Sequence, residues 1–203
     1  MSIKFVFLAI PLALMAVLGL SNCTKFKTEI TQKPLAKKNP ISYEFEVPVE
    51  AVRSTLRAIR DSQFEPFFPN LRMYFKEDNN PFVAPPYVNF DFTKAEFEHD
   101  VFLYCWHKPI VKSPVYFVKN ESLDYLASFH LHITPIKVSH TLVEVFTHRP
   151  EVIAGQTSGF LNPHGPANIY VSVQPTTIEE YKILLKIGDR LGIKGMPDLV
   201  EPD

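Results

Sequence analysis

The sequence predicts an α+β fold, in which a curved antiparallel sheet carries an early helix and a long C-terminal helix. Two segments, residues 48–61 and 178–191, show the 3.6-residue periodicity of amphipathic helices. The chain between them alternates apolar and polar residues and is rich in β-branched and aromatic side chains. Residues 41–203 are numerous enough to enclose one sizeable core, so we expect them to form a single domain.

The first predicted helix covers residues 48–61 and has two distinct sides. Its apolar side consists of Val49, Val52, Leu56 and Ile59. Pro48 suits the first helical position, where a backbone N–H is not needed. The opposite side carries Arg53, Arg57 and Arg60. Because Glu50 and Asp61 lie within one turn of these arginines, we interpret this side as a solvated, locally paired face. The alternative is that the three arginines bind an anionic group.

The second predicted helix runs from Ile178 to Leu191. Thr177 and Glu180 have the spacing of a capping box at its start, and Gly192 is suited to end it. Its apolar stripe consists of Ile178, Tyr181, Leu184, Leu185, Gly188 and Leu191. The glycine within this stripe predicts a close approach to the sheet that the helix covers.

Seven segments have the composition and alternation of strands. They are residues 43–47, 87–92, 97–106, 115–118, 125–136, 138–148 and 169–173. The fifth and sixth are predicted to form a hairpin around residues 135–139. The order of strand, helix, antiparallel strands and long final helix resembles the helix-grip, or START-like, fold. That resemblance implies an apolar cavity held between a curved sheet and the last helix.

A long connection rich in aromatic residues and proline, residues 64–87, is the predicted ligand site. Such connections often form lids or binding loops, and prolines lower the entropy cost of holding rings in place. The residues expected to contact a ligand are Phe67, Phe68, Tyr74, Phe82 and Tyr87. The alternative is that these rings fill the core beneath the connection.

The first 23 residues have the order of an export signal. Lys4 precedes the sixteen apolar residues 5–20, a run shorter than the roughly 20 needed to span a bilayer. Leu20-Ser21-Asn22-Cys23 follows, and this arrangement resembles the signal peptide of a bacterial lipoprotein. The resemblance implies removal of residues 1–22, acylation of Cys23 and attachment to a membrane of the cell envelope, the outer membrane rather than the inner. Cleavage after Ser21 without acylation, or an uncleaved anchor, are the alternatives.

Residues 23–40 are predicted to form a flexible, basic tether. Residues 24–40 contain five lysines and one glutamate, and lysines beside an acyl anchor are attracted to anionic head groups. Residues 41–203 contain 15 Lys and Arg against 21 Asp and Glu, a net charge of −6. This charge does not favour nucleic acid as a partner. Cys105 lies in an apolar stretch and is expected to be a buried thiol without a partner.

Two histidines provide the one metal-like signal that we find in the sequence. His130 and His132 share one face of a predicted strand and could hold zinc if a third ligand approached. The candidate third ligands are His140, Glu144, His148 and His164. A half-solvated strand has the same alternation without any metal. Three acids on another predicted strand, Glu96, Glu98 and Asp100, could likewise bind a cation or form a solvent face.

No catalytic motif is evident. Gly155-Gln156-Thr157-Ser158-Gly159 does not match the nucleophile elbow, and no phosphate-binding glycine loop is present. We therefore expect a non-enzymatic, membrane-anchored envelope lipoprotein without a cofactor, which binds an apolar ligand or an envelope protein. The alternatives are a membrane-tethered, metal-dependent hydrolase that uses His130 and His132, and a surface-exposed interaction protein.

Overall fold

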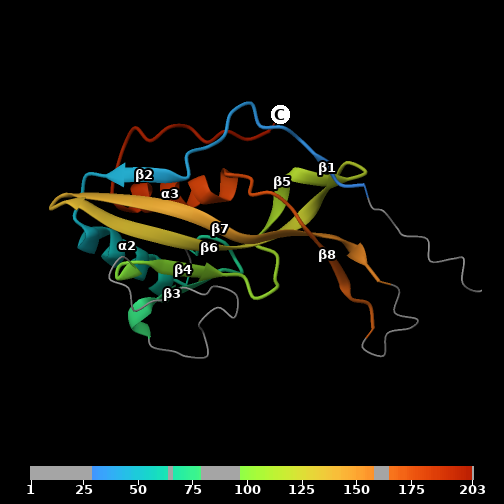
Figure 1. Ribbon diagram of the computed structural model, residues 1–203, viewed down its shortest axis with the longest axis horizontal. Helices are drawn as coiled ribbons and strands as arrows, with labels where there is room; N and C mark the ends of the chain where they lie inside the picture. The colour runs from blue at the N-terminus through green and yellow to red at the C-terminus, as the bar shows by residue number, and fades with distance from the viewer. Residues whose placement is uncertain (1–28, 64–65, 79–96, 158–164, 203) are drawn as a thin grey trace, which may run out of the picture.

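The computed structural model describes residues 29–63, 66–78, 97–157 and 165–202. Within these residues, eight strands form one open, curled antiparallel sheet, and two α-helices cover one of its faces (Figure 1). The predicted α+β class is confirmed. In the same part of the chain, no helix has the length and apolar character needed to cross a bilayer.

A long hairpin is the centre of the sheet. It consists of β6 (Glu121–Lys137) and β7 (His140–Gln156), each 17 residues long. The two strands are paired from Asp124 opposite Ile153 to Lys137 opposite His140 (Figure 1). The predicted hairpin is confirmed, but β7 continues well beyond residue 148. A register shift before Pro150, with Arg149 at φ 48°, lets the strand pass this proline as a bulge.

The other six strands flank this hairpin in two groups. Near its turn, the additional strands are β4 (Val101–Tyr104) and β3 (Arg72–Phe75) beyond β6, and β2 (Ser42–Phe45) beside β7. At the open end, they are β5 (Val111–Val118) and β1 (Thr31–Gln32) beyond β6, and β8 (Asn168–Ser172) beside β7. The sequence did not predict β1 or β3, and the strand predicted at residues 87–92 lies outside the described residues.

Helices α2 (Val49–Asp61) and α3 (Ile178–Arg190) begin and end close to their predicted positions. Their apolar faces meet the inward side of the hairpin in one core. The core includes Phe45, Val52, Leu56, Ile59, Phe129, Leu131, Ile133, Tyr181, Leu184 and Ile187. Successive residues of β6 alternate between this core and the opposite face of the sheet, as the pleat requires. That opposite face carries His130 and His132.

The two ends of α3 differ in how well they were predicted. Thr177 makes no side-chain capping bond; instead, the Ile178 N–H donates to Thr176 Oγ1 at 3.1 Å. The predicted capping box is therefore wrong about the threonine, because Thr176 and not Thr177 accepts the capping hydrogen bond. Gly192 ends the helix as predicted, with φ 73°, and the Ile193 N–H donates to the Gly188 carbonyl at 2.9 Å. A side chain at Gly188 would collide with Met196 of the C-terminal segment and would also contact Phe45 of β2.

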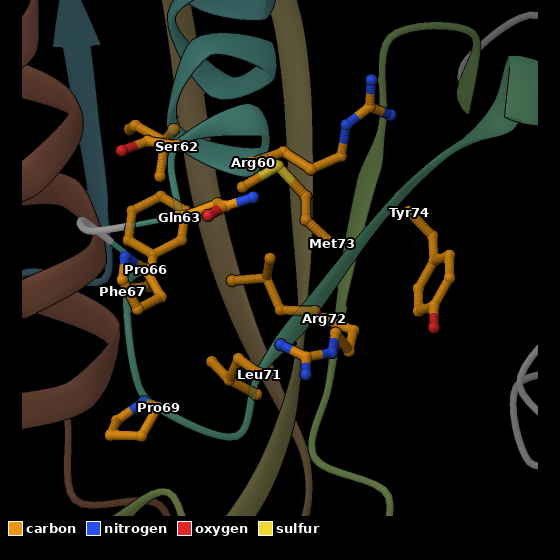
Figure 2. Close-up of a pocket in the computed structure, with 12 residues that line it drawn as sticks. Arg60, Ser62, Gln63, Pro66, Phe67, Pro69, Leu71, Arg72, Met73 and Tyr74 are labelled. Carbon is orange, nitrogen blue, oxygen red and sulfur yellow. The ribbon is translucent and has the colours of Figure 1, made fainter.

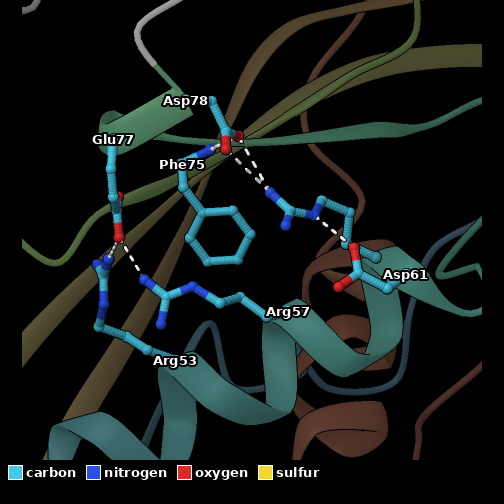
Figure 3. Close-up of polar contacts among 7 residues, drawn as sticks. Arg53, Arg57, Asp61, Phe75, Glu77 and Asp78 are labelled. Atoms are coloured by element: carbon cyan, nitrogen blue, oxygen red, sulfur yellow. Dashed lines mark hydrogen bonds and ion pairs between the residues drawn. The ribbon is translucent and has the colours of Figure 1, made fainter.

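Of the three arginines of α2, Arg53 is buried, Arg57 is partly buried and Arg60 is exposed, so the predicted solvated face is confirmed only in part. Arg53 and Arg57 both donate to Glu77 in the short 3₁₀ helix η1 (Lys76–Asp78), and Arg60 bonds Asp61 and Asp78 (Figure 3). The Phe75 ring lies among the three guanidinium groups, 4.8–5.7 Å from their central carbons. This cluster holds α2 against the end of β3. The local pairing predicted from Glu50 and Asp61 is thus wrong in most of its partners.

Residues 29–40 differ from the predicted flexible tether. Thr31 and Gln32 pair with β5, and the Lys33 N–H donates to the Val115 carbonyl at 2.9 Å. The buried Asn39 side chain donates to the Val200 carbonyl at 2.9 Å and accepts from the Val200 N–H at 2.8 Å. These contacts fasten the N-terminal segment to both the sheet and the C-terminal segment.

Arg53→Met should lower the free energy of unfolding by about 1–2 kcal/mol. Arg53 is 5% exposed, so methionine keeps its packing while Glu77 loses a charged hydrogen-bond donor. The matched control is Arg57→Met, because Arg57 donates to the same carboxylate from a side chain that is 38% exposed. That variant should lose less than about 1 kcal/mol. Urea unfolding measures the free energy of unfolding of both variants. Equal losses would contradict the inference that the Arg53–Glu77 bond stabilises the cluster more than the Arg57–Glu77 bond does.

Candidate functional site

Asp100, His130 and His132 form a buried polar group on the sheet face that the helices leave uncovered. Asp100 Oδ2 lies 2.6 Å from His130 Nε2, and Asp100 Oδ1 lies 3.1 Å from His132 Nδ1. Asp100 is 1% exposed and His130 3%, whereas the His132 side chain is 23% exposed. The group is thus nearly sealed, with His132 as its contact with solvent.

The register of β4 and β6 brings these three residues together. Phe102 lies opposite His130 in an antiparallel pair, so Asp100, two residues earlier and just before β4, lies beside His132. Asp100 N–H donates to the Phe97 carbonyl at 3.3 Å, in a turn that precedes the strand. The predicted strand at residues 97–106 is therefore shorter, and Glu98 lies in this turn while Asp100 is buried. Glu96 lies outside the described residues.

Aromatic side chains enclose the group. The Phe102 ring stacks on His130, with centroids 4.6 Å apart and planes 3° apart, and Phe97 meets both imidazoles edge-on. The registers place Tyr74, Phe102, His130 and Phe146 in one row across β3, β4, β6 and β7. Burial, together with the nearby His130, lowers the pKa of His148 in the adjacent row.

The third residue of the group differs from those predicted. Among the described residues, the Asp100, His130 and His132 ligand atoms all lie within 4.8 Å of one another, and Glu144, His140 and His148 are not part of this set. Glu144 is paired with His132 across the hairpin, but its carboxylate is not in the set. His164 lies outside the described residues.

A cavity of about 440 Å³ lies between the end of α2, the segment that follows it and the edge strand β3 (Figure 2). Its apolar walls come from Ile59, Pro66, Phe67, Pro69, Leu71, Met73, Tyr74 and Leu103. Its polar lining comes from Arg60, Ser62, Gln63 and Arg72. The cavity lies beside α2, whereas the helix-grip resemblance implies a cavity against the final helix.

The structure separates the aromatic residues predicted to contact a ligand. Phe67 and Tyr74 line the cavity, although the Tyr74 ring projects away from the other labelled side chains (Figure 2). Phe68 is buried and stacks on Phe129 at 6.3 Å, so it fills the core. Phe82 and Tyr87 lie outside the described residues, as does Cys23. Arg72, which the sequence reading did not single out, belongs to the cavity as well.

Two buried carboxyl groups lie at the start of α3, inside the core. Glu179 accepts a hydrogen bond from Thr176 Oγ1, and Glu180 accepts one from Thr147 Oγ1. The second carboxyl oxygen of each glutamate has no hydrogen-bond partner among the described residues. The Tyr125 hydroxyl has none there either. Burial raises the pKa of both glutamates, against the opposing effect of these hydroxyl groups. Buried Cys105 lies near Tyr125, and burial raises the pKa of its thiol, as expected for an inert cysteine.

Searches against models of protein families, curated proteins and solved structures find no match for this chain. The chemistry of the two sites therefore follows from their own residues. The Asp100 group offers two imidazoles and a carboxylate to a cation or a proton. The cavity offers apolar walls and arginine to an uncharged or anionic molecule.

Glu179→Gln should make the protein more stable at mildly alkaline pH. A folded-state pKa raised above the ordinary 4.5 means that the folded protein holds this proton more tightly than the unfolded chain. The related stability is fully present below the unfolded pKa and is lost as pH rises through the folded pKa. Thermal unfolding across a pH series should thus show a flatter profile for Glu179→Gln. The exposed Glu121→Gln is the control, and parallel profiles for the parent and Glu179→Gln would exclude this source of pH dependence.

Proposed function

We propose that this protein is a lipid-anchored envelope protein that holds an apolar ligand with a negatively charged group in the cavity beside β3. The observation that carries the proposal is the cavity itself, with about 440 Å³ of space, mostly apolar walls and two arginines. This volume and this mixture of side chains are typical of small-molecule sites. The proposed role is binding, without a chemical step.

Arg72 is the residue proposed to contact the negative group. Arg60 also lines the cavity, but it is already bonded to Asp61 at 2.9 Å and Asp78 at 3.1 Å. The exposed Arg72 guanidinium has no carboxylate partner among the described residues, and none of the described lining residues is acidic. An arginine at the rim of an apolar cavity favours a ligand with a carboxylate or a phosphate.

The walls of the cavity are held in place before any ligand arrives. Leu71, Met73 and Leu103 belong to the core, and Asn70 Nδ2 donates to the Pro109 carbonyl beyond β4. Pro66 and Pro69 flank the aromatic residues of the connection and restrict its backbone. A preformed wall lowers the ordering cost of binding.

The helix-grip resemblance belongs to the same proposal in a modified form. Supporting it, α3 packs on β7 and β2, and α2 lies beside α3 on the same face of the sheet. The space beneath α3 is filled by Tyr181, Ile183 and Ile187, all fully buried. In this proposal, the ligand site has moved from the final helix to the end of α2.

Arg72→Gln should weaken binding of a long-chain fatty acid about tenfold, because it removes a charge-assisted hydrogen bond. The same change should leave binding of the corresponding fatty alcohol unaltered. Lys137→Gln, which alters an exposed cation on β6 away from the cavity, is the matched control. Fluorescence competition on the protein without residues 1–23 measures the affinities, and native mass spectrometry detects co-purified lipid. An empty protein that binds neither compound would refute the proposal.

Cys23→Ala should abolish metabolic labelling with a fatty acid and release the protein from the membrane fraction. The reason is that the proposed acyl attachment site is the Cys23 thiol, and residues 5–20 are too few for a stable span. Cys105→Ala is the matched control, since this buried thiol should not be labelled. If Cys23→Ala remains labelled and membrane-bound, the anchor is of another kind.

A further inference from the structure

We propose that Asp100, His130 and His132 bind one divalent transition-metal ion of the zinc type. The inference concerns the face of the sheet opposite the helices and does not depend on the proposed cavity ligand. Three donor atoms, His130 Nε2, His132 Nδ1 and an Asp100 carboxylate oxygen, lie within 4.8 Å of one another. Two imidazoles and one carboxylate are a common donor set for zinc and iron(II), and they leave further coordination positions for water.

Part of the group already has close to the spacing of metal ligands. Asp100 Oδ2 is 2.6 Å from His130 Nε2, and both carboxylate oxygens are 3.1 Å from His132 Nδ1. Ligands about 2.0–2.1 Å from a tetrahedral ion lie roughly 3.3 Å apart, so the Asp100–His130 contact must widen, and the two imidazole nitrogens, which lie within 4.8 Å of each other, must take up the same spacing. The proton on each coordinating nitrogen must then move to the other ring nitrogen or leave for solvent.

Surrounding groups already orient the three side chains. The Ile133 N–H donates to Asp100 Oδ1 at 3.1 Å, and Thr134 Oγ1 lies 3.2 Å from His132 Nε2. Phe102 fixes the plane of His130 by stacking on it. Second contacts of this kind hold metal ligands in position in known sites. They also rule out a loose acidic patch, because Asp100 and His130 are almost fully buried.

Burial provides a physical reason for a cation. An ionised carboxylate in an apolar setting is costly unless hydrogen bonds and opposite charge compensate it. Asp100 has hydrogen bonds from Ile133 and from the two imidazoles, and the enclosing Phe97 and Phe102 rings leave it in an apolar setting where further opposite charge is stabilising. A divalent ion would supply it, and the partly exposed His132 is the expected side of entry. A metal-dependent hydrolase, the alternative expected from the sequence, requires this ion first.

The test is metal binding by the full chain. After treatment with a chelator and dialysis, titration with Zn²⁺ by calorimetry and with Co²⁺ by visible absorption should both give one ion per chain. His132→Gln should weaken binding by more than about 100-fold, because it removes a ligand, and Thr134→Val by about 10–100-fold, because it removes a second contact. His140→Gln, which lies in the same hairpin outside the group, should bind as the parent does.

Thermal unfolding separates a metal effect from a folding defect. Added Zn²⁺ should raise the melting temperature of the parent and His140→Gln, and leave that of His132→Gln unchanged. Asp100→Asn should also lose binding; if it fails to fold, His132→Gln decides alone, since its side chain is partly exposed. Substoichiometric binding by the parent, or equal binding by His132→Gln, would overturn the proposal and leave the group as a hydrogen-bonded network.

Discussion

The pairing of β6 with β7 is the interaction on which the rest of this structure depends. The two strands exchange hydrogen bonds over nearly their whole length, and each of the other six strands pairs with one of them or with a strand that does. Both helices pack on the inward side of the same hairpin. A change of register by one residue would exchange the two faces of β6. Phe129, Leu131 and Ile133 would then leave the core, and His130 and His132 would enter it.

This register also determines where chemistry is possible. Because β4 and β3 extend the sheet only near the turn of the hairpin, the Asp100 group and the cavity both lie at that end. The bulge at Arg149 and Pro150 keeps β7 in the sheet and lets the Val173 N–H donate to the Pro150 carbonyl at 2.9 Å. That bond fixes the chain shortly before α3 begins. The position of the final helix thus follows from the hairpin, as does the buried setting of Glu179 and Glu180.

The parts of the fold that local periodicity specifies could be predicted from the sequence. Val52, Leu56 and Ile59 recur at helical spacing and are buried as expected, and Gly192 ends α3. Two of the errors in strand length lie at prolines, since the predicted strands begin after Pro114 and end before Pro150, although both prolines are accommodated within β5 and β7. At β5 the Ser113 hydroxyl accepts from the Val115 and Tyr116 N–H groups across a register shift. Such compensation depends on neighbours that the sequence does not identify.

The candidate sites required contacts between segments distant in the chain. The alternation of the sequence shows that His130 and His132 share a face. Asp100 joins them only because β4 pairs directly with β6, although β5 lies between these two strands in the sequence. Sequential strands are more often neighbours, so local reasoning favoured partners on the adjacent strand, such as Glu144 and His148. The partner of Arg53 was predicted wrongly for a similar reason, since its acceptor, Glu77, follows β3 and is distant in the sequence. In each case the missing information was tertiary pairing, while the residue types were visible in the sequence.

The two proposed sites are neighbours at β3 and β4. Leu103 faces the cavity, while its neighbour Phe102 faces the opposite side and stacks on His130. Alternation therefore places a cavity wall and a metal-site wall one residue apart on β4, while Tyr74 of the cavity lies in the same row as Phe102 and His130. Coupling between the sites would require β4 to adopt two arrangements, and its pairing with both β3 and β6 opposes this. Arg72 is not a metal ligand and His132 does not line the cavity, so a substitution at either residue should alter one binding activity alone, which allows the two proposals to succeed or fail separately.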